Sequence, residues 1–274
     1  MPELPEIETI RRELQERIVG LRIEDVVYET PKMLLPNPQS LISGVKGAEV
    51  VQVGRRAKMP LLFLSNGKIL VFHLKLNGQL LVRKVSEPQD QFVRVKFIFD
   101  NDEELRFAEM RKFGWVKLLP NEAELEEVTI ALGPEPFSKE FNLHYFQEKL
   151  AETKRAIKVV LTDQENFAGI GNIYATEALF HAGVDPRRPA NALTPEESSR
   201  LYEKILWVLK QGLRYQGTTD RDLAYVRISG EPGRFQEHLA VYGREGEPCL
   251  KCGKPVEKIK IGGRGTYFCS KCQT

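Results

Sequence analysis

Four cysteines at the carboxyl end of the chain constrain its fold more than any other feature. They form two Cys-x2-Cys pairs, sixteen residues apart, within the last 26 of 274 positions: Cys249, Cys252, Cys269 and Cys272. Each pair can place two thiolates on one ion, and two pairs complete the tetrahedral shell that zinc prefers. A four-cysteine shell leaves no open position for water, so the sequence predicts one structural zinc ion and no dispersed disulfide framework.

The segment between the two pairs predicts a β-hairpin. It runs from Pro255 to Ile261, turns at Gly262-Gly263 and returns through Thr266-Tyr267-Phe268. Arg264 follows the turn, where its side chain could reach a phosphate or a base. Considered alone, such an arginine is an ordinary solvated charge.

The amino end is the second constraint. One face of a predicted helix is apolar, at Ile7, Ile10, Leu14 and Ile18. Gly20 would end this helix, Pro5 suits its first turn, and Glu6 suits the positive end of the helix dipole. If Met1 is removed, Pro2 becomes a secondary amine on a rigid element, which is either a reactive group or only a chain end.

Between these ends the periodicity changes from strands to helices. Alternating or apolar runs predict strands at 45–53, 60–64, 68–72, 92–99, 104–107 and 115–119. A break rich in proline and glycine at 132–138 precedes helical patterns at 142–152, 154–163, 173–182 and 194–211. The expected fold class is α+β: a leading helix, an antiparallel β-sandwich or barrel, a helical region and the zinc hairpin.

A glycine-rich turn joins two of the predicted helices at Gly169-Ile170-Gly171-Asn172. Glycines let a backbone approach a ligand, and a helix start offers N–H groups to a phosphate. Asn172 could cap the helix or donate to that phosphate, and Lys154, Arg155 and Lys158 on the preceding predicted helix could add contacts. In isolation, a plain helical corner explains the turn as well.

The stretch Arg111-Lys112-Phe113-Gly114-Trp115 pairs two cations with two aromatic side chains. A protein that extracts a base from duplex DNA must fill the gap, and an apolar wedge beside an arginine could do so. Spacing alone favours the alternative, in which Phe113 and Trp115 are core residues and Arg111 lies on the surface.

Charge and hydropathy exclude few classes. No apolar run approaches the roughly 20 residues of a membrane span, and the acidic start is unlike a signal peptide, so we expect an intracellular protein. The net charge is +2, with 10 Lys/Arg against 7 Asp/Glu in residues 217–274. This distribution favours a polyanionic partner only weakly.

Together and in this order, these motifs resemble the bacterial formamidopyrimidine-DNA glycosylase family, within the wider group that includes endonuclease VIII. The similarity runs nearly end to end, through 2–9, 55–58, 73–74, 111–114, 132–136, 169–174, and 263–266 with the four cysteines. Leu4 is typical of the formamidopyrimidine branch, since endonuclease VIII typically has glycine there.

The resemblance implies a domain order and an activity. It implies an N-terminal catalytic β-sandwich (1–131), a linker (132–140), a helix–two-turn–helix DNA-binding domain (141–238) and a zinc finger (239–274), with double-stranded DNA between the lobes. The expected protein is a monomeric, cytoplasmic base-excision-repair enzyme that associates with the nucleoid through DNA. It would remove oxidised purines such as 8-oxoguanine and formamidopyrimidines, and cleave abasic sites by β,δ-elimination. The alternatives are an oxidised-pyrimidine glycosylase and a non-catalytic zinc-finger protein that binds damaged DNA.

The resemblance also assigns roles to residues. Pro2 would attack C1′ of the damaged nucleotide to form a Schiff base, Glu3 would be the general acid/base, and Lys58 would bind a phosphate near the lesion. Arg111 and Phe113 would fill the space left by the everted base, with Arg111 facing the orphan cytosine. The further expected DNA contacts are Leu76, Lys154, Asn172 and Arg264.

Several positions depart from the family pattern. They are Ala57 in place of glycine, Lys75-Leu76-Asn77 in place of Arg-Met-Glu, Phe92 in place of a phosphate-binding histidine, and Glu109 in place of aspartate. Leu76 would be the apolar wedge, similar to methionine in volume but less adaptable. Residues 218–233 match the position of the family's lesion-contacting loop. These departures leave the chemistry intact and the preferred base open.

Overall fold

The computed structural model describes residues 2–219 and 224–274. They form two compact units, one of residues 1–130 and 215–236 and the other of 131–214 and 237–274. Residues 215–236 thus belong with the amino-terminal unit although they follow the helices of the second. The finer division into four domains stays a prediction. No helix within the described residues is long and apolar enough to cross a membrane.

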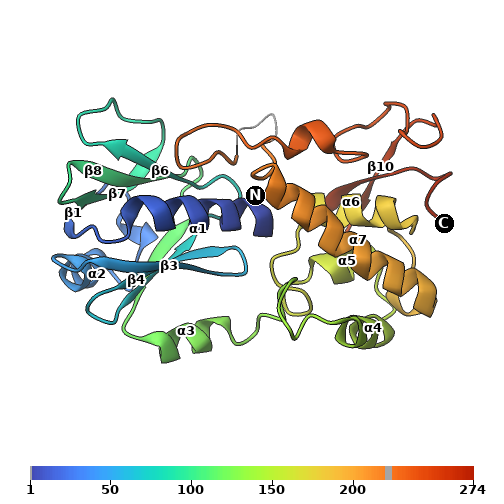
Figure 1. Cartoon of the computed structure of the whole chain (residues 1–274), viewed down its shortest axis with the longest axis horizontal. Helices are drawn as coiled ribbons and strands as arrows, with labels where there is room; N and C mark the ends of the chain where they lie inside the picture. Colours follow the sequence, from blue (N-terminus) through green and yellow to red (C-terminus); the bar gives the residue numbers. More distant parts are fainter. Residues whose placement is uncertain (1, 220–223) are drawn as a thin grey trace. The chain divides into compact units, whose positions relative to one another are not determined.

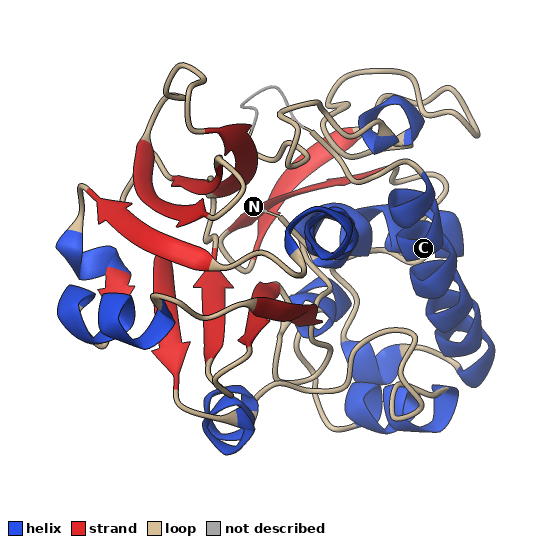
Figure 2. Cartoon of the chain, turned by 60° about the vertical axis from the view of Figure 1, so that its left-hand side comes forward, coloured by secondary structure: helices blue, strands red, loops and turns tan. Residues whose placement is uncertain are grey.

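The first unit contains the predicted leading helix and two β-sheets (Figures 1 and 2). One sheet has the order β1-β7-β8-β6 and the other β2-β9-β5-β4-β3. All neighbours are antiparallel except β2 and β9. The elements are α1 (Leu4–Ile18), β1 (Ile23–Tyr28), β2 (Leu34–Leu35), α2 (Pro38–Val45), β3 (Val50–Arg56), β4 (Met59–Leu64), β5 (Ile69–His73), β6 (Gln79–Lys84), β7 (Val93–Phe99), β8 (Glu103–Ala108), β9 (Trp115–Leu119) and α3 (Glu122–Thr129).

The core of this unit confirms the patterns on which the fold was predicted. The four apolar residues that predicted α1 are fully buried, and β7 alternates buried and half-buried side chains along its whole length. The Asn66-Gly67 turn joins β4 to β5, with the N–H of Leu64 donating to the carbonyl of Lys68. The expected strand at 45–53 was wrong in its first half, because α2 extends to Val45 after Asn37 caps it through the N–H of Ser40.

The second unit is helical and ends in a hairpin. Its elements are α4 (Leu143–Ala151), α5 (Ile157–Thr162), α6 (Asn172–Ala182), α7 (Pro195–Arg214), β10 (Glu257–Ile261) and β11 (Arg264–Phe268). A capping box begins α7, in which the side chains of Thr194 and Glu197 each accept the other's backbone N–H. The prediction of a helix from Lys154 was wrong, since α5 starts at Ile157.

Candidate functional site

Pro2 and Glu3 lie at the start of α1, where Glu6 fixes the backbone. The N–H of Glu3 donates to Oε2 of Glu6 at 2.8 Å, and the N–H of Thr218 donates to Oε1 of Glu6 at the same distance. Pro2, Glu3 and Glu6 are all buried. One carboxylate therefore holds both the backbone beside Pro2 and the chain at Thr218.

Gly217 makes the second of these contacts possible. Its backbone has φ +84°, and a Cβ atom there would lie 2.8 Å from the Tyr225 ring and 2.9 Å from Cγ of Glu6. Both distances are too short for a side chain, so glycine is required by conformation and by space. The predicted lesion-contacting loop follows directly, and its residues 220–223 lie outside the described residues.

Lys58 lies in the tight turn between β3 and β4. Ala57 before it has φ +50°, which explains why glycine is usual at this position in the family. Arg55 ties the turn to α1, since its guanidinium donates to the Ala57 carbonyl at 2.9 Å and to Glu8 at 3.3 Å. Burial would raise the pKa of Glu8, but hydrogen bonds from neighbouring arginines outweigh it and lower that pKa. The turn that carries Lys58 is therefore held to α1, the helix that Pro2 precedes.

His73, at the end of β5, had no predicted role. Burial, followed by the charges of Lys75 and Lys58, lowers the pKa of His73 to about 4, so its imidazole is neutral near pH 7. Nδ1 of His73 accepts the N–H of Lys75 at 3.1 Å. Two lysines around a neutral imidazole suit a phosphate ligand. A histidine at a strand end, two residues before a lysine, is the signal that could have suggested this group.

The loop 110–113 is exposed and is held from beneath by the buried side chain of Glu109. The Glu109 carboxylate accepts the N–H groups of Arg111 at 3.1 Å and Phe113 at 2.6 Å. The Arg111 guanidinium lies 4.9 Å from the centre of the Phe113 ring. Phe113 is 55% exposed, so the core position that spacing favours is wrong. Leu76, in the loop before β6, is also exposed.

In the second unit, Asn172 and the finger hairpin are brought together. Lys158 Nζ donates to Oδ1 of Asn172, and the Asn172 amide donates to the carbonyl of Gly265 at 3.0 Å. Lys158 is buried, so it orients Asn172 rather than facing solvent. Arg264, next to Gly265, is exposed at the hairpin tip, whereas Lys154 lies exposed in the turn before α5.

The four cysteine sulfurs form a compact group. They all lie within 4.8 Å of one another, with Cys249 and Cys272 at 3.9 Å and Cys252 and Cys269 at 3.5 Å. A zinc tetrahedron with bonds of about 2.3 Å has sulfur–sulfur edges of about 3.8 Å. The donor set fits one structural zinc ion, and β10 and β11 form the predicted hairpin between the pairs.

Glu177, in the middle of α6, is a residue that sequence reasoning missed. It is fully buried and accepts three consecutive backbone N–H groups, from Ala240, Val241 and Tyr242, at 2.8–3.0 Å. Burial raises its pKa against the lowering effect of these hydrogen bonds. The carboxylate thereby fixes to α6 the chain that leads into the zinc finger.

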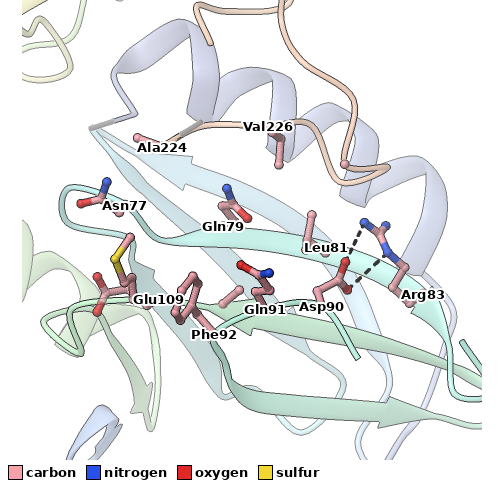
Figure 3. A pocket seen from close by; sticks show the side chains of 13 residues that line it. Asn77, Gln79, Leu81, Arg83, Asp90, Gln91, Phe92, Glu109, Ala224 and Val226 are labelled. Atoms are coloured by element: carbon pink, nitrogen blue, oxygen red, sulfur yellow. Dashed lines mark hydrogen bonds and ion pairs between the residues drawn. The ribbon is translucent and has the colours of Figure 1, made fainter. Parts of the chain in front are cut away.

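A cavity of ≈ 390 Å³ lies beside β6 in the first unit (Figure 3). Its lining comes from β6, the residues before β7, the end of β8 with Glu109 and Met110, and the segment 224–230. Arg83 and Asp90 form an ion pair at 3.4 Å in its wall. Three amide side chains and one exposed ring also line it, at Asn77, Gln79, Gln91 and Phe92.

Models of known protein families match three segments of this chain. Residues 1–116 match the formamidopyrimidine-DNA glycosylase N-terminal domain, residues 132–223 the H2TH domain of that enzyme, and residues 246–274 a zinc finger found in FPG and IleRS. Formamidopyrimidine-DNA glycosylase of Bacillus cereus is 41% identical over 276 residues, covering 100% of this chain and 99% of the relative. That of Heliobacterium modesticaldum is 42% identical and covers 100% of both chains.

Solved structures agree with the sequence matches. The MutM (FPG) protein of Thermus thermophilus is 39% identical with a TM-score of 0.90, covering 99% of this chain and 98% of that one. The Lactococcus lactis Fpg in complex with abasic-site DNA is 33% identical with a TM-score of 0.93, covering 99% of both chains. The wild-type L. lactis protein with DNA containing N7-benzyl-Fapy-dG has a TM-score of 0.92 at 33% identity, with full coverage of both.

Proposed function

This chain belongs to the formamidopyrimidine-DNA glycosylase family, and we propose on that basis that it excises oxidised purines, such as 8-oxoguanine and formamidopyrimidines, from double-stranded DNA. It then cleaves the abasic site by β,δ-elimination. The observation that carries the proposal is the full-length similarity to L. lactis Fpg structures bound to DNA with a Fapy-dG derivative or an abasic site. The protein would act in the cytoplasm, on nucleoid DNA.

Pro2 is the proposed nucleophile. A secondary amine that attacks C1′ displaces the damaged base, and the C1′–O4′ bond of the sugar then breaks to leave an iminium ion, which permits elimination of the phosphate. Glu3 would protonate the sugar oxygen and move protons during elimination. The bond from Glu3 N–H to Glu6 restricts the backbone beside the amine, and such restriction favours the near-attack geometry.

The remaining proposed contacts hold the DNA. Lys58 would bind a phosphate near the lesion, beside His73, and Arg264 and Asn172 would bind flanking phosphates. Leu76, Phe113 and Arg111 would occupy the gap in the duplex, which their exposure permits. When bound, zinc would supply only rigidity, through the four cysteines that support the Arg264 hairpin.

Borohydride trapping tests the proposal directly. Protein verified to begin at Pro2 is mixed with duplexes containing 8-oxoguanine, a formamidopyrimidine, an oxidised pyrimidine or an abasic site, and adducts are counted by gel mobility. We expect covalent adducts on the purine lesions and the abasic site. Adducts only on the oxidised pyrimidine and the abasic site would support the endonuclease VIII type, and none on any duplex would indicate a non-catalytic binder.

Pro2→Gly is the matched variant. It removes the secondary amine while leaving Glu3, Glu6 and the DNA contacts in place. We expect DNA affinity close to that of the unmodified protein and a large loss of turnover. Cleavage at the unmodified rate would rule out Pro2 as the nucleophile.

A further inference from the structure

Trp207, on α7, is a large apolar side chain that packing of the helix does not require. It is 43% exposed, whereas α7 buries its opposite face through Leu201, Ile205 and Val208. The ring centre lies 4.7 Å from that of His181 and 5.7 Å from the Lys204 ammonium. Tryptophan is among the residues that contribute most binding energy at protein interfaces, so its exposure here indicates a possible contact surface.

Three lysines surround this ring. Lys204 and Lys210 lie three residues before and after Trp207, and residues at that spacing are neighbours on one face of a helix. Lys251, from the zinc finger, lies 4.4 Å from the centre of the Phe180 ring on α6. Within residues 2–219 and 224–274, none of the three lysines forms an ion pair with a carboxylate. Their positive charge is therefore not compensated by this part of the protein.

His181 connects these groups. Burial, followed by the charges of Lys251 and Lys204, lowers the pKa of His181 to about 4, so both ammonium groups lie near the ring that contacts Trp207. Lys251 also donates to a carbonyl at the end of α6, at 3.2 Å, which stabilises that helix end. Among the described residues, Lys204 and Lys210 make no such bond, so helix stabilisation does not account for them.

Leu250 adds apolar area beside Lys251, since it is 67% exposed. We name the whole group the Trp207 surface, formed by His181, Lys204, Trp207, Lys210, Leu250 and Lys251. Exposed apolar side chains among uncompensated cations complement a segment that carries both apolar and acidic side chains.

The proposed DNA contacts lie elsewhere on this unit. Asn172 begins α6, and His181 lies nine residues later, about 14 Å along the helix axis. The Trp207 ring already has two neighbours, which leaves less of it for stacking of a nucleobase. Both observations favour a protein partner over a nucleic acid.

We infer that the Trp207 surface binds an acidic segment of a partner protein. An apolar side chain of that segment would lie against Trp207 and Leu250, and its carboxylates would face the three lysines. The inference goes beyond the proposed function, because none of these residues is among the proposed catalytic residues or DNA contacts. The partner would bind while the protein is on DNA.

A labelled peptide in which aspartates surround two phenylalanines is the probe. Its counterpart has lysines in place of the aspartates. Fluorescence anisotropy measures binding of each peptide to the full, zinc-loaded chain. We expect the acidic peptide to bind, with an affinity that falls as salt rises, because salt screens exposed charges. We expect the basic peptide not to bind.

Two variants test the surface. Trp207→Ala should weaken binding of the acidic peptide about tenfold or more, as expected for a tryptophan at the centre of an interface. Lys204→Glu should weaken it about fivefold or more by reversing one charge. This second variant keeps the indole, so it tests the surface independently of any loss of stability in Trp207→Ala.

Phe137→Ala is the matched control. Phe137 is also an exposed aromatic residue of the second unit, 46% exposed, but it lies outside the Trp207 surface. Its alanine variant should bind the acidic peptide like the unmodified protein.

Several results would overturn the inference. They are absence of binding by the acidic peptide, unchanged affinity in both Trp207→Ala and Lys204→Glu, or an equal loss in Phe137→Ala. Tighter, Trp207-dependent binding of an oligothymidylate or of anionic lipid vesicles would also overturn it, since the partner would then be a nucleic acid or a membrane. Saturating abasic-site duplex should leave the peptide bound. Displacement of the peptide would place this surface among the DNA contacts and contradict the inference.

Discussion

Asp102 closes the β7–β8 hairpin with a left-handed backbone, φ +61°, and an exposed side chain. Glycine is favoured at this position of a hairpin loop because it has no Cβ to oppose positive φ. Glycine relieves the strain of the left-handed backbone but also gives the unfolded chain more conformational entropy. Because the first effect is larger, we expect Asp102→Gly to raise the free energy of unfolding by about 0.5–1 kcal/mol. Urea unfolding with an unchanged m-value measures this, and Asp102→Ala, which keeps the strain, should show no gain.

His181 makes stability depend on pH. Burial, followed by the charges of Lys251 and Lys204, lowers the pKa of His181 from 6.5 to about 4. Between these values the unfolded chain binds a proton that the folded chain does not, so stability is lost as pH falls from about 6.5 to 4. His73 acts in the same direction.

We expect His181→Gln to lose less stability than the unmodified protein over that pH interval, by about 1–3 kcal/mol. Thermal melts at pH 7 and pH 4.5 give the comparison. Parallel pH profiles for the two proteins would show that His181 titrates normally in the folded state.

At the scale of elements, Glu177 joins α6 to the chain that enters the zinc finger. Glutamine offers one acceptor oxygen, and its NH₂ group would face a backbone N–H, so Glu177→Gln leaves at least one of the three donors without a partner. We expect a loss of about 3 kcal/mol of stability and faster zinc release to a chelator. Glu203→Gln on the exposed face of α7 is the control, expected within about 0.5 kcal/mol of the unmodified protein. If Glu177→Gln released zinc at the rate of the control variant, the chain that leads into the zinc finger would not depend on this carboxylate.

The periodicity of the sequence predicts most of the helices and strands. It does not predict the side-chain contacts that join one element to another. Three local patterns are confirmed by the structure: the apolar face of α1, the alternation of β7 and the spacing of the cysteines. Glu177 could not have been found this way, because its partners lie 63–65 positions away and a carboxylate inside an apolar helix matches no periodic pattern. Phe113 was misjudged for a related reason: Glu109 holds its loop outward, which strand spacing cannot reveal.

For the whole molecule, the distribution of basic residues matters more than the net charge of +2. Each phosphate contact releases counterions, so the slope of log K against log salt reports the number of contacts. We expect Arg264→Ala to reduce this slope by about 0.9 and to weaken binding similarly on all sequences. Lys139→Ala, outside the proposed contacts, should leave the slope unchanged. An unchanged slope for Arg264→Ala would remove Arg264 from the phosphate contacts.

The contact of Glu6 with Thr218 has a consequence for how this protein can evolve. A side chain at position 217 would collide with Glu6 and Tyr225. Substitution of Glu6 would remove the acceptor of the N–H groups of Glu3 and Thr218. The permitted substitutions at positions 6 and 217 therefore depend on each other, although they lie far apart along the chain. Among descendants of this sequence, mutations at these two positions should be found as pairs, and the order in which they arise should decide which lineages keep a working enzyme.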